Sequence, residues 1–368
     1  MNMRLAQVDT PALVVDADRL ARNLAQVQRD VEATGKKLRP HIKAHKMPEV
    51  ARRQRELGAI GLTTAKLAEA EAMAAAGLDE LFICYPVIGR AKIERLLLLA
   101  RERNVMTVAD SAAGADALGA AFAGEERSLG VLVKVDAGFG RVGARAADAV
   151  ELCRRVEATA GLAFRGVCIH EGSTYAEPDT RRRQQLASAQ AGELVAIAEQ
   201  VRALGIAVDI VSAGSTPGLA GCLGVEGLTE VRPGNYVFYD AIQVGLGVAA
   251  LEECALSVLT TVVSTARPSG AICDAGTKAL SLDRGAHGLD ITDAYGAIVG
   301  REGLTLQRLS EEHGWLADES GTDCAVGDVL RVIPNHACAV VNNFDHVWVA
   351  EGDKVVDRWP ITARGAVT

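Results

Sequence analysis

Short apolar runs alternate with helical stretches along the first two-thirds of the chain. Eight of these runs have the length and the apolar character of buried strands. They are Leu38–Ile42, Ile60–Thr63, Leu81–Tyr85, Met106–Ala109, Val131–Val135, Gly166–Ile169, Val208–Ser212 and Glu230–Arg232. Amphipathic helical periodicity lies between them, as at Lys66–Ala76 and Gln184–Leu204. Eight βα units within about 210 residues predict a (β/α)8 barrel, in which polar residues at the carboxyl ends of the strands carry the chemistry.

The pattern changes after about residue 245, where short β-rich runs are separated by glycine or charged residues. These runs are Leu256–Val263, Ala271–Asp274, Val329–Ile333 and His346–Val349. Ala12–Val15 precedes the first βα unit and is expected to join these strands. We therefore predict an α/β protein with a TIM barrel over residues 20–245 and a β domain formed by residues 1–19 and 246–368.

The composition narrows the class of protein. Hydrophobic residues make up 49% of the 368 residues, so a large core can be buried. The net charge of −8, without a basic stripe, argues against binding to nucleic acid or to an anionic membrane. The eight cysteines are scattered singly, and the first ten residues lack the apolar core of a signal peptide. The sequence thus predicts a soluble, reduced, cytoplasmic protein.

A lysine follows the first predicted strand, in the run Arg39–Lys43. Burial disfavours the charged form of a lysine, and a neutral lysine amine is a good nucleophile toward a carbonyl group. Lys43 is therefore a candidate catalytic residue. The alternative is a surface lysine that extends its charged end into solvent. Lys46 is the competing lysine nearby and is expected to be the more exposed of the two.

Three glycine-containing loops follow predicted strands. The loop Asp136–Gly143 presents Arg141, whose guanidinium could hydrogen-bond a phenolate or a carboxylate. The runs Gly214–Pro217 and Val231–Tyr236 follow the seventh and eighth strands, where barrels of this type recurrently bind phosphate through backbone N–H groups. Ordinary βα turns are the alternative for all three loops.

The run Pro334–Cys338 contains a candidate metal pair, His336 and Cys338. Residues two apart in a strand point to the same side, so both side chains can reach one ion. Imidazole and thiolate suit Zn2+ best, with Mn2+ or Mg2+ as alternatives. Water or substrate would complete the coordination, and a half-buried strand without a metal is the competing interpretation.

Together these motifs resemble those of the metal-dependent D-threonine aldolase and D-serine dehydratase family. The resemblance extends from about Asp9 to about Gly365 and rests on motifs that occur in the same order. They are Arg39–Lys43, Val135–Gly143, Gly214–Pro217, Val231–Tyr236, Asp274–Gly276, Glu312–Gly314 and Pro334–Cys338. The resemblance implies an alanine racemase-like fold, pyridoxal 5′-phosphate (PLP) as cofactor, a divalent metal and a homodimer.

The resemblance also implies roles for individual residues. Lys43 matches the lysine that forms the Schiff base with PLP, and Arg141 matches an arginine that contacts the phenolic oxygen. His170 lies at a catalytic position beside the cofactor, and Arg232 corresponds to an arginine that faces the pyridine nitrogen. The implied phosphate-binding residues are Gly214, Ser215, Thr216, Gly234 and Asn235. The implied metal ligands are His336 and Cys338, whose cation would bind the substrate hydroxyl as a Lewis acid.

The predicted activity is that of a lyase acting on β-hydroxy-D-amino acids. The tail Trp359–Gly365 favours a D-threonine aldolase, which gives glycine and acetaldehyde. Cys338 and the run His170–Tyr175 favour the close alternative, a dehydratase of D-serine or D-threo-3-hydroxyaspartate that gives a 2-oxo acid and ammonia. A PLP-binding protein without turnover is an alternative of a different class, disfavoured by the metal pair and the β domain.

Overall fold

The structure is a computed structural model that describes residues 3–266, 270–286, 289–301, 303–318 and 324–368. Its residues group into two compact units. The barrel unit comprises Val27–Lys43, Val50–Gly234 and Ala366–Thr368. The β unit comprises Met1–Gln26, Ala44–Glu49 and Asn235–Gly365. The domain boundaries at residues 19 and 245 stay a prediction beside this grouping.

The barrel unit contains an eight-stranded parallel sheet. Its strands are β3 (Lys37–Leu38), β4 (Leu62–Thr64), β5 (Leu81–Pro86), β6 (Val105–Ala109), β7 (Leu129–Lys134), β8 (Leu162–Cys168), β9 (Ile210–Ala213) and β10 (Glu230–Val231). The sheet order runs from β4 through β10 to β3. A parallel bridge between His41 and Thr63, and a 2.9 Å hydrogen bond from the Ile60 N–H to the Leu38 carbonyl, join its two edges. The predicted TIM barrel is confirmed.

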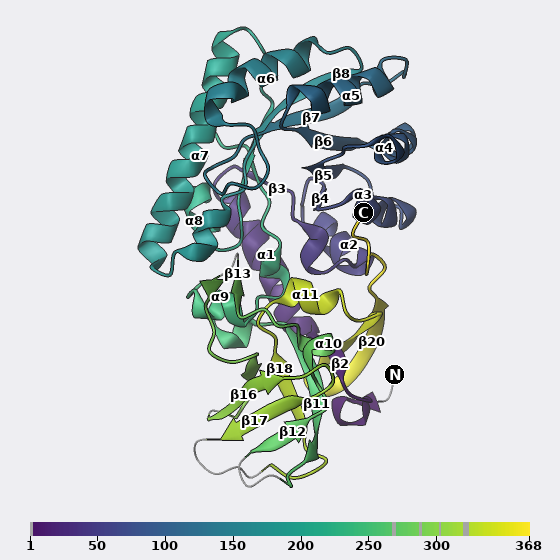
Figure 1. Cartoon of the computed structure of the whole chain (residues 1–368), viewed down its shortest axis with the longest axis vertical. Coiled ribbons are helices and arrows are strands. Elements are labelled where there is room, and N and C mark those ends of the chain that lie inside the picture. Colours follow the sequence, from purple (N-terminus) through teal and green to yellow (C-terminus); the bar gives the residue numbers. More distant parts are fainter. Residues whose placement is uncertain (1–2, 267–269, 287–288, 302, 319–323) are drawn as a thin grey trace. The chain divides into compact units, whose positions relative to one another are not determined.

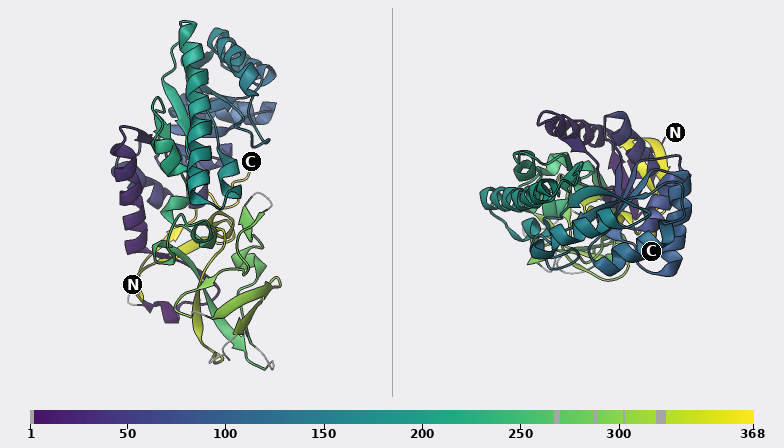
Figure 2. Two further views of the ribbon diagram at one scale, coloured as in Figure 1. Left: turned by 90° about the vertical axis from the view of Figure 1, so that its left-hand side faces the viewer. Right: turned by 90° about the horizontal axis from the view of Figure 1, so that it is seen from above.

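Helices cover the outside of the barrel strands, as Figure 1 shows. They are α3 (Leu67–Ala75), α4 (Arg90–Glu102), α5 (Ala112–Phe122), α6 (Ala146–Ala158), α7 (Thr180–Ala203) and α8 (Leu219–Leu223). Two earlier helices, α1 (Ala17–Glu32) and α2 (Pro48–Glu56), cross the unit boundaries along the chain. The 24-residue α7, the long teal helix in Figure 2, contacts β8 and β9 of the sheet and the helices α6 and α8. No helix among the described residues is long and apolar enough to span a membrane.

Strands β3 and β10 are shorter than the apolar runs that predicted them. Pro40 and Pro233 follow these strands, and proline cannot donate a hydrogen bond to a sheet. Pairing nevertheless continues past the assigned ends, because the Arg39 N–H donates to the Val231 carbonyl and the His41 N–H donates to the Pro233 carbonyl, each over 3.0 Å. The first and last strands therefore stay paired across the two prolines, just before the chain reaches Lys43 and Gly234.

The β unit is a second structure, in which the strands pair antiparallel except for the parallel pair of β2 and β19. Its strands are β1 (Met3–Arg4), β2 (Ala12–Asp16), β11 (Leu256–Ser264), β12 (Ala271–Cys273), β15 (Ala297–Ile298), β16 (Leu304–Leu309), β17 (Gly314–Asp318), β18 (Val329–Ile333), β19 (His346–Glu351) and β20 (Lys354–Pro360), with the pair β13 (Gly285–Ala286) and β14 (Leu289–Asp290) apart. Pairing of β11 with β18 closes the strands from β11 to β18 into a barrel. The short helices are α9 (Ala241–Gly245), α10 (Thr277–Leu280) and α11 (Ala337–Val341). As predicted, Ala12–Val15 joins this sheet, between β11 and β19.

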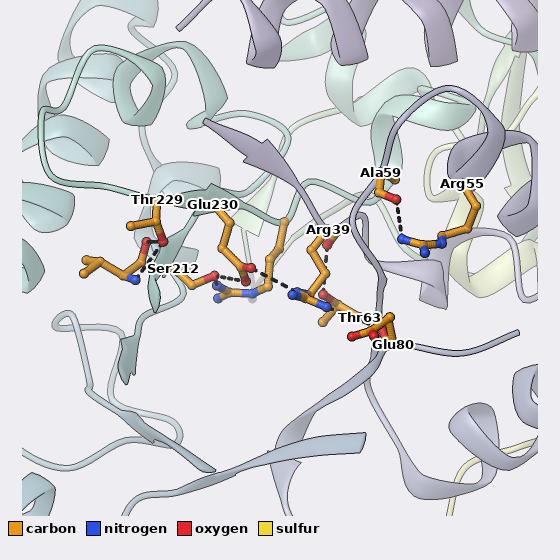
Figure 3. Close-up of polar contacts among 10 residues, drawn as sticks. Arg39, Arg55, Ala59, Thr63, Glu80, Ser212, Thr229 and Glu230 are labelled. Carbon is orange, nitrogen blue, oxygen red and sulfur yellow. Dashed lines mark hydrogen bonds and ion pairs between the residues drawn. The ribbon is translucent and has the colours of Figure 1, made fainter. Parts of the chain in front are cut away.

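A buried ion pair joins Arg39, which follows β3, to Glu230 of the neighbouring strand β10 (Figure 3). The Arg39 Nε donates to the Glu230 Oε2 over 3.0 Å, and the two side chains are only 6% and 2% exposed. The other carboxylate oxygen accepts the Ser212 hydroxyl over 2.7 Å. Removing one partner of such a pair leaves an uncompensated buried charge.

We expect Glu230→Gln to lower the free energy of unfolding of the cofactor-free protein by about 3 kcal/mol, as measured by urea denaturation. Glu71→Gln is the matched control, because Glu71 pairs with Arg95 at the surface with side chains 35% and 36% exposed. The control should show a much smaller loss, since exposed pairs contribute little. Equal losses in the two variants would contradict the expectation that the buried pair contributes more to stability than the exposed pair.

Candidate active site

Lys43 lies just beyond the first barrel strand, in the 3₁₀ turn Ile42–Ala44. Its side chain is half-buried, and its backbone N–H donates to the Nδ1 of His41 over 3.4 Å. The charge of Lys43 lowers the pKa of His41, which follows β3, and of His170, which follows β8. Lys43 is thus surrounded by polar side chains at the carboxyl end of the barrel, where the sequence placed it.

The surroundings of the two histidines beside Lys43 favour the neutral imidazole. Burial lowers the pKa of His41 and of His170 well below its usual value, and the charge of Lys43 is the next largest cause for both. Arg232 and Lys134 add to the effect on both rings. A neutral imidazole can accept a proton near pH 7, so this group of side chains contains two candidate bases.

The glycine-rich loop after β7 presents Arg141 next to His170. The Asp136 carboxylate accepts the N–H groups of Phe139 and Gly140 over 3.0 and 3.1 Å, which fixes the turn. The Arg141 guanidinium lies 4.9 Å from the centre of the Phe139 ring, and that ring meets the His170 ring edge-on at 6.0 Å. Arg141 is exposed, so its donors remain available to a ligand.

Two glycines form a tight cradle between the loops after β9, β10 and β3. Gly214 has a φ of +103°, and a Cβ there would lie 2.9 Å from the Val231 Cβ. A Cβ on Gly234 would lie 2.9 Å from the His41 carbonyl oxygen. In the described part of the chain, the N–H of the buried Gly234 has no hydrogen-bond acceptor. Buried N–H groups without a partner are rare, so the cradle fits an oxyanion such as a phosphate.

Ser215 and Thr216 are buried beside this cradle, 5% and 6% exposed. The Ser215 N–H donates to the Oε1 of Glu171 over 2.6 Å. Glu171 was missed from the sequence, because glutamate is rarely fully buried. Its place directly after His170 was the only signal.

Arg232 is buried inside the barrel and is held by its neighbours. Its guanidinium donates to the Ser212 hydroxyl and, over 2.5 Å, to the Ile169 carbonyl, and it lies 5.7 Å from the centre of the Phe82 ring. Burial alone would lower the pKa of Arg232, but Cys84 and other acidic groups of the barrel raise it above its usual value. The side chain is therefore a fixed cation.

The metal pair lies in the β unit, but not on a strand as expected. His336 precedes helix α11 and Cys338 lies within that helix, so the prediction that the pair sits on a strand is wrong. The chain leaves β18 at Ile333 and turns into the helix. The Cys338 thiol still lies close enough to the imidazole to raise the pKa of His336. The turn at a helix start thus brings residues i and i+2 together by another geometry.

Asp283 orients the His336 ring, because its Oδ2 lies 2.7 Å from the His336 Nδ1. Burial alone would lower the pKa of His336, but Cys338 and Asp283 raise it well above its usual value. A histidine whose Nδ1 is bound by a carboxylate offers Nε2 to a metal. No group of three or more potential metal ligands occurs among the residues that the structure describes. The pair would provide two protein ligands, and the cation stays a prediction.

We expect Asp283→Asn to weaken Zn2+ binding by about 10- to 100-fold, because a ligand histidine loses the carboxylate that orients it. Competition with a chelating dye measures the change. Asp290→Asn removes one negative charge from strand β14, where Asp290 pairs with Arg284 over 3.3 Å. This control should leave the affinity for Zn2+ unchanged. Equal affinities of wild type and Asp283→Asn would contradict the role of Asp283.

Asn235, expected in the phosphate site, also belongs to the β unit. Its Nδ2 donates to the Asp240 Oδ2 over 2.6 Å. The same oxygen of Asp240 accepts the Ala337 N–H over 2.9 Å. The Asn235 side chain is thereby tied to the segment that carries His336, which leaves its backbone N–H as the candidate phosphate donor.

Lys46 differs from its prediction. The side chain is buried, 6% exposed, and its Nζ donates to the Asn342 Oδ1 over 2.9 Å. Lys43 is therefore the more exposed of the two lysines. The hydrogen bond replaces water at the Lys46 ammonium, which makes burial tolerable.

Comparison with known proteins finds two family models. Residues 15–241 match the model for the alanine racemase N-terminal domain, and residues 255–350 match the model for a serine dehydratase domain. The chain is 36% identical to the D-threo-3-hydroxyaspartate dehydratase of Delftia sp. (strain HT23) over 375 residues, which cover 98% of each protein.

Solved structures of similar proteins include both an aldolase and a dehydratase. The crystal structure of D-threonine aldolase from Filomicrobium marinum has a TM-score of 0.91 at 32% identity and covers 100% of this chain and 99% of its own. A D-threo-3-hydroxyaspartate dehydratase in which a cysteine is replaced by alanine, in the metal-free form, has a TM-score of 0.91 at 34% identity, with 97% and 98% covered.

Proposed function

The chain belongs to the family that combines an alanine racemase N-terminal domain with a serine dehydratase domain, and from this we propose a PLP- and divalent-metal-dependent lyase acting on β-hydroxy-D-amino acids. Within that class we propose the D-threonine aldolase type. The proposal includes a homodimer, as the sequence resemblance implied, and a cytoplasmic location, as the composition predicted. Light scattering of the purified protein tests the assembly.

One observation carries the proposal: Lys43 lies among two neutral histidines and a fixed arginine in a unit that also forms an oxyanion cradle. Lys43 would hold the aldehyde carbon of PLP and Arg141 its phenolic oxygen. Arg232 would face the pyridine nitrogen. The phosphate would lie in the cradle, with Gly214, Ser215, Thr216, Gly234 and Asn235 around it. PLP, when bound, supplies a sink for the electrons released at the substrate α-carbon.

The side chains around Lys43 can move the protons that either reaction needs. Cleavage between Cα and Cβ requires a base for the substrate hydroxyl proton, and the depressed pKa of His170 keeps its imidazole ready to accept one. Dehydration instead requires removal of the Cα proton, which the Lys43 amine could accept. The aldolase and the dehydratase thus differ in whether the hydroxyl proton or the Cα proton is removed first.

The chemistry of His336 and Cys338 fits a divalent cation. Imidazole and thiolate are ligands of Zn2+, and the carboxylate of Asp283 already orients the imidazole. When bound, the cation supplies a Lewis acid for the substrate hydroxyl. The metal-free form named for a cysteine variant of the related dehydratase supports a metal at such a pair.

A dehydratase is the second candidate, because the Delftia relative of 36% identity is a dehydratase. Incubation of the holoenzyme with D-threonine and with D-serine separates the two. We expect acetaldehyde and glycine from D-threonine. Formation of 2-oxobutanoate or pyruvate with ammonia would replace the aldolase by the dehydratase. Bound PLP without turnover of any D-substrate would instead support a PLP-binding protein that is not an enzyme.

A further inference from the structure

Glu171 is a fully buried acidic residue, with a side chain that is 0% exposed, and its burial needs an explanation. Its Oε1 accepts the Ser215 N–H over 2.6 Å and the Cys222 thiol over 3.3 Å. Its Oε2 has no partner among the residues that the structure describes. Burying a carboxylate is unfavourable unless specific contacts compensate. Filling space in the core therefore does not account for this residue.

The backbone N–H and the side-chain hydroxyl of Ser215 are both engaged by this arrangement. Its N–H goes to Glu171. The Thr174 hydroxyl donates to the Glu171 carbonyl over 2.6 Å, so Ser215 donates its own proton to the Thr174 oxygen over 3.2 Å. The Ser215 Oγ in turn accepts the Gly218 N–H over 3.2 Å. Ser215 thus has no donor left for a phosphate.

The position of Ser215 nevertheless decides the shape of the cradle. Gly214, its neighbour in the chain, packs against Val231 and Arg232, so closely that a Cβ would lie 2.9 and 3.1 Å from their nearest atoms. A shift at Ser215 would therefore move the contact between the loops after β9 and β10. The second of these loops carries the unpaired N–H of Gly234.

We propose that Glu171 is a positioning residue for the phosphate of PLP. It acts through Ser215, by anchoring the Ser215 N–H and with it the two loops that form the cradle. Ser215 thereby acts indirectly, as the link between Glu171 and the cradle. The proposal rests on the proposed function only in taking PLP as the ligand.

The test compares PLP with pyridoxal, which has the same aldehyde and ring but no phosphate. The full chain, freed of cofactor, is titrated with each compound. The dissociation constant of pyridoxal divided by that of PLP measures the contribution of the phosphate. We expect Glu171→Leu to lower this ratio roughly 10- to 100-fold, because the anchor of a buried N–H is lost. Glu171→Gln keeps an acceptor oxygen and should retain most of the ratio.

Glu69→Leu is the matched control. Glu69 is also buried, 2% exposed, and its Oε2 accepts the Ala65 N–H over 2.7 Å. It should affect stability but leave the ratio unchanged. If Glu171→Leu weakens PLP and pyridoxal equally, or if Glu171→Gln raises the ratio by removing a charge that repels phosphate, the inference is overturned while the proposed function stands. A wild-type chain that binds neither compound would overturn both.

Discussion

Replacement of Lys43 by alanine is expected to abolish the covalent attachment of PLP and to reduce turnover by at least about 10³-fold, the scale on which removal of a covalent catalyst acts. Among the candidate residues, Lys43 alone offers an amine within the group of side chains formed by His41, His170 and Arg232. Borohydride reduction followed by peptide mass analysis measures the attachment. The wild-type chain should carry the added mass on the peptide that contains Lys43.

Lys46→Met is the control for this experiment. The Lys46 ammonium is occupied by Asn342, so the variant should still become labelled at Lys43, even if it is less stable. Label on Lys46 in the wild type, or a fully active Lys43→Ala, would refute the assignment of Lys43. Unlabelled but active wild-type protein would remove PLP from the proposed function altogether.

Removal of the divalent cation is expected to stop turnover while PLP stays bound. A Lewis acid at the substrate hydroxyl contributes several kcal/mol, so we expect EDTA treatment and His336→Ala each to reduce turnover by about 10³-fold or more. The visible absorbance of the cofactor should persist, because Lys43 is unchanged. Adding back Zn2+, Mn2+ or Mg2+ to the EDTA-treated protein identifies the cation that restores activity.

His313→Ala is the matched control for His336→Ala, because His313 is an exposed histidine of the same unit. It should leave both the metal content and the activity unchanged. Full activity of His336→Ala in the presence of EDTA would exclude a metal held by His336. The same outcome would remove the metal from the proposed function.

The barrel could be predicted from the sequence because each strand is an apolar run that is buried among helices. The hydrophobic pattern located all eight strands, and it placed Ala12–Val15 with the later β strands. It overestimated the lengths of β3 and β10, because proline interrupts a hydrogen-bonding ladder without interrupting an apolar run. The pattern also could not show that His336 and Cys338 lie at the start of a helix, since five residues are too few for helical periodicity.

Residues of the candidate site could be predicted where they follow a strand. They could not be predicted where tertiary contacts determine whether a side chain is buried. Lys43, Arg141 and Arg232 follow strands, so the sequence located them. The burial of Lys46 depends on Asn342, and that of Glu171 on Ser215 and Cys222. These partners lie far along the chain, and no local pattern reports them.

The place of β2 in its sheet has a consequence for how the protein is made. Its hydrogen-bonded neighbours are β11 and β19. Ala12–Asp16 therefore emerges from the ribosome before both partner strands, the earlier of which begins at Leu256. At a synthesis rate of about 5–20 residues per second, that wait lasts on the order of tens of seconds. The barrel strands are complete by Val231 and can associate earlier. During synthesis the apolar segment Ala12–Val15 is therefore left unpaired while the barrel strands form, and the sheet around β2 can form only afterwards.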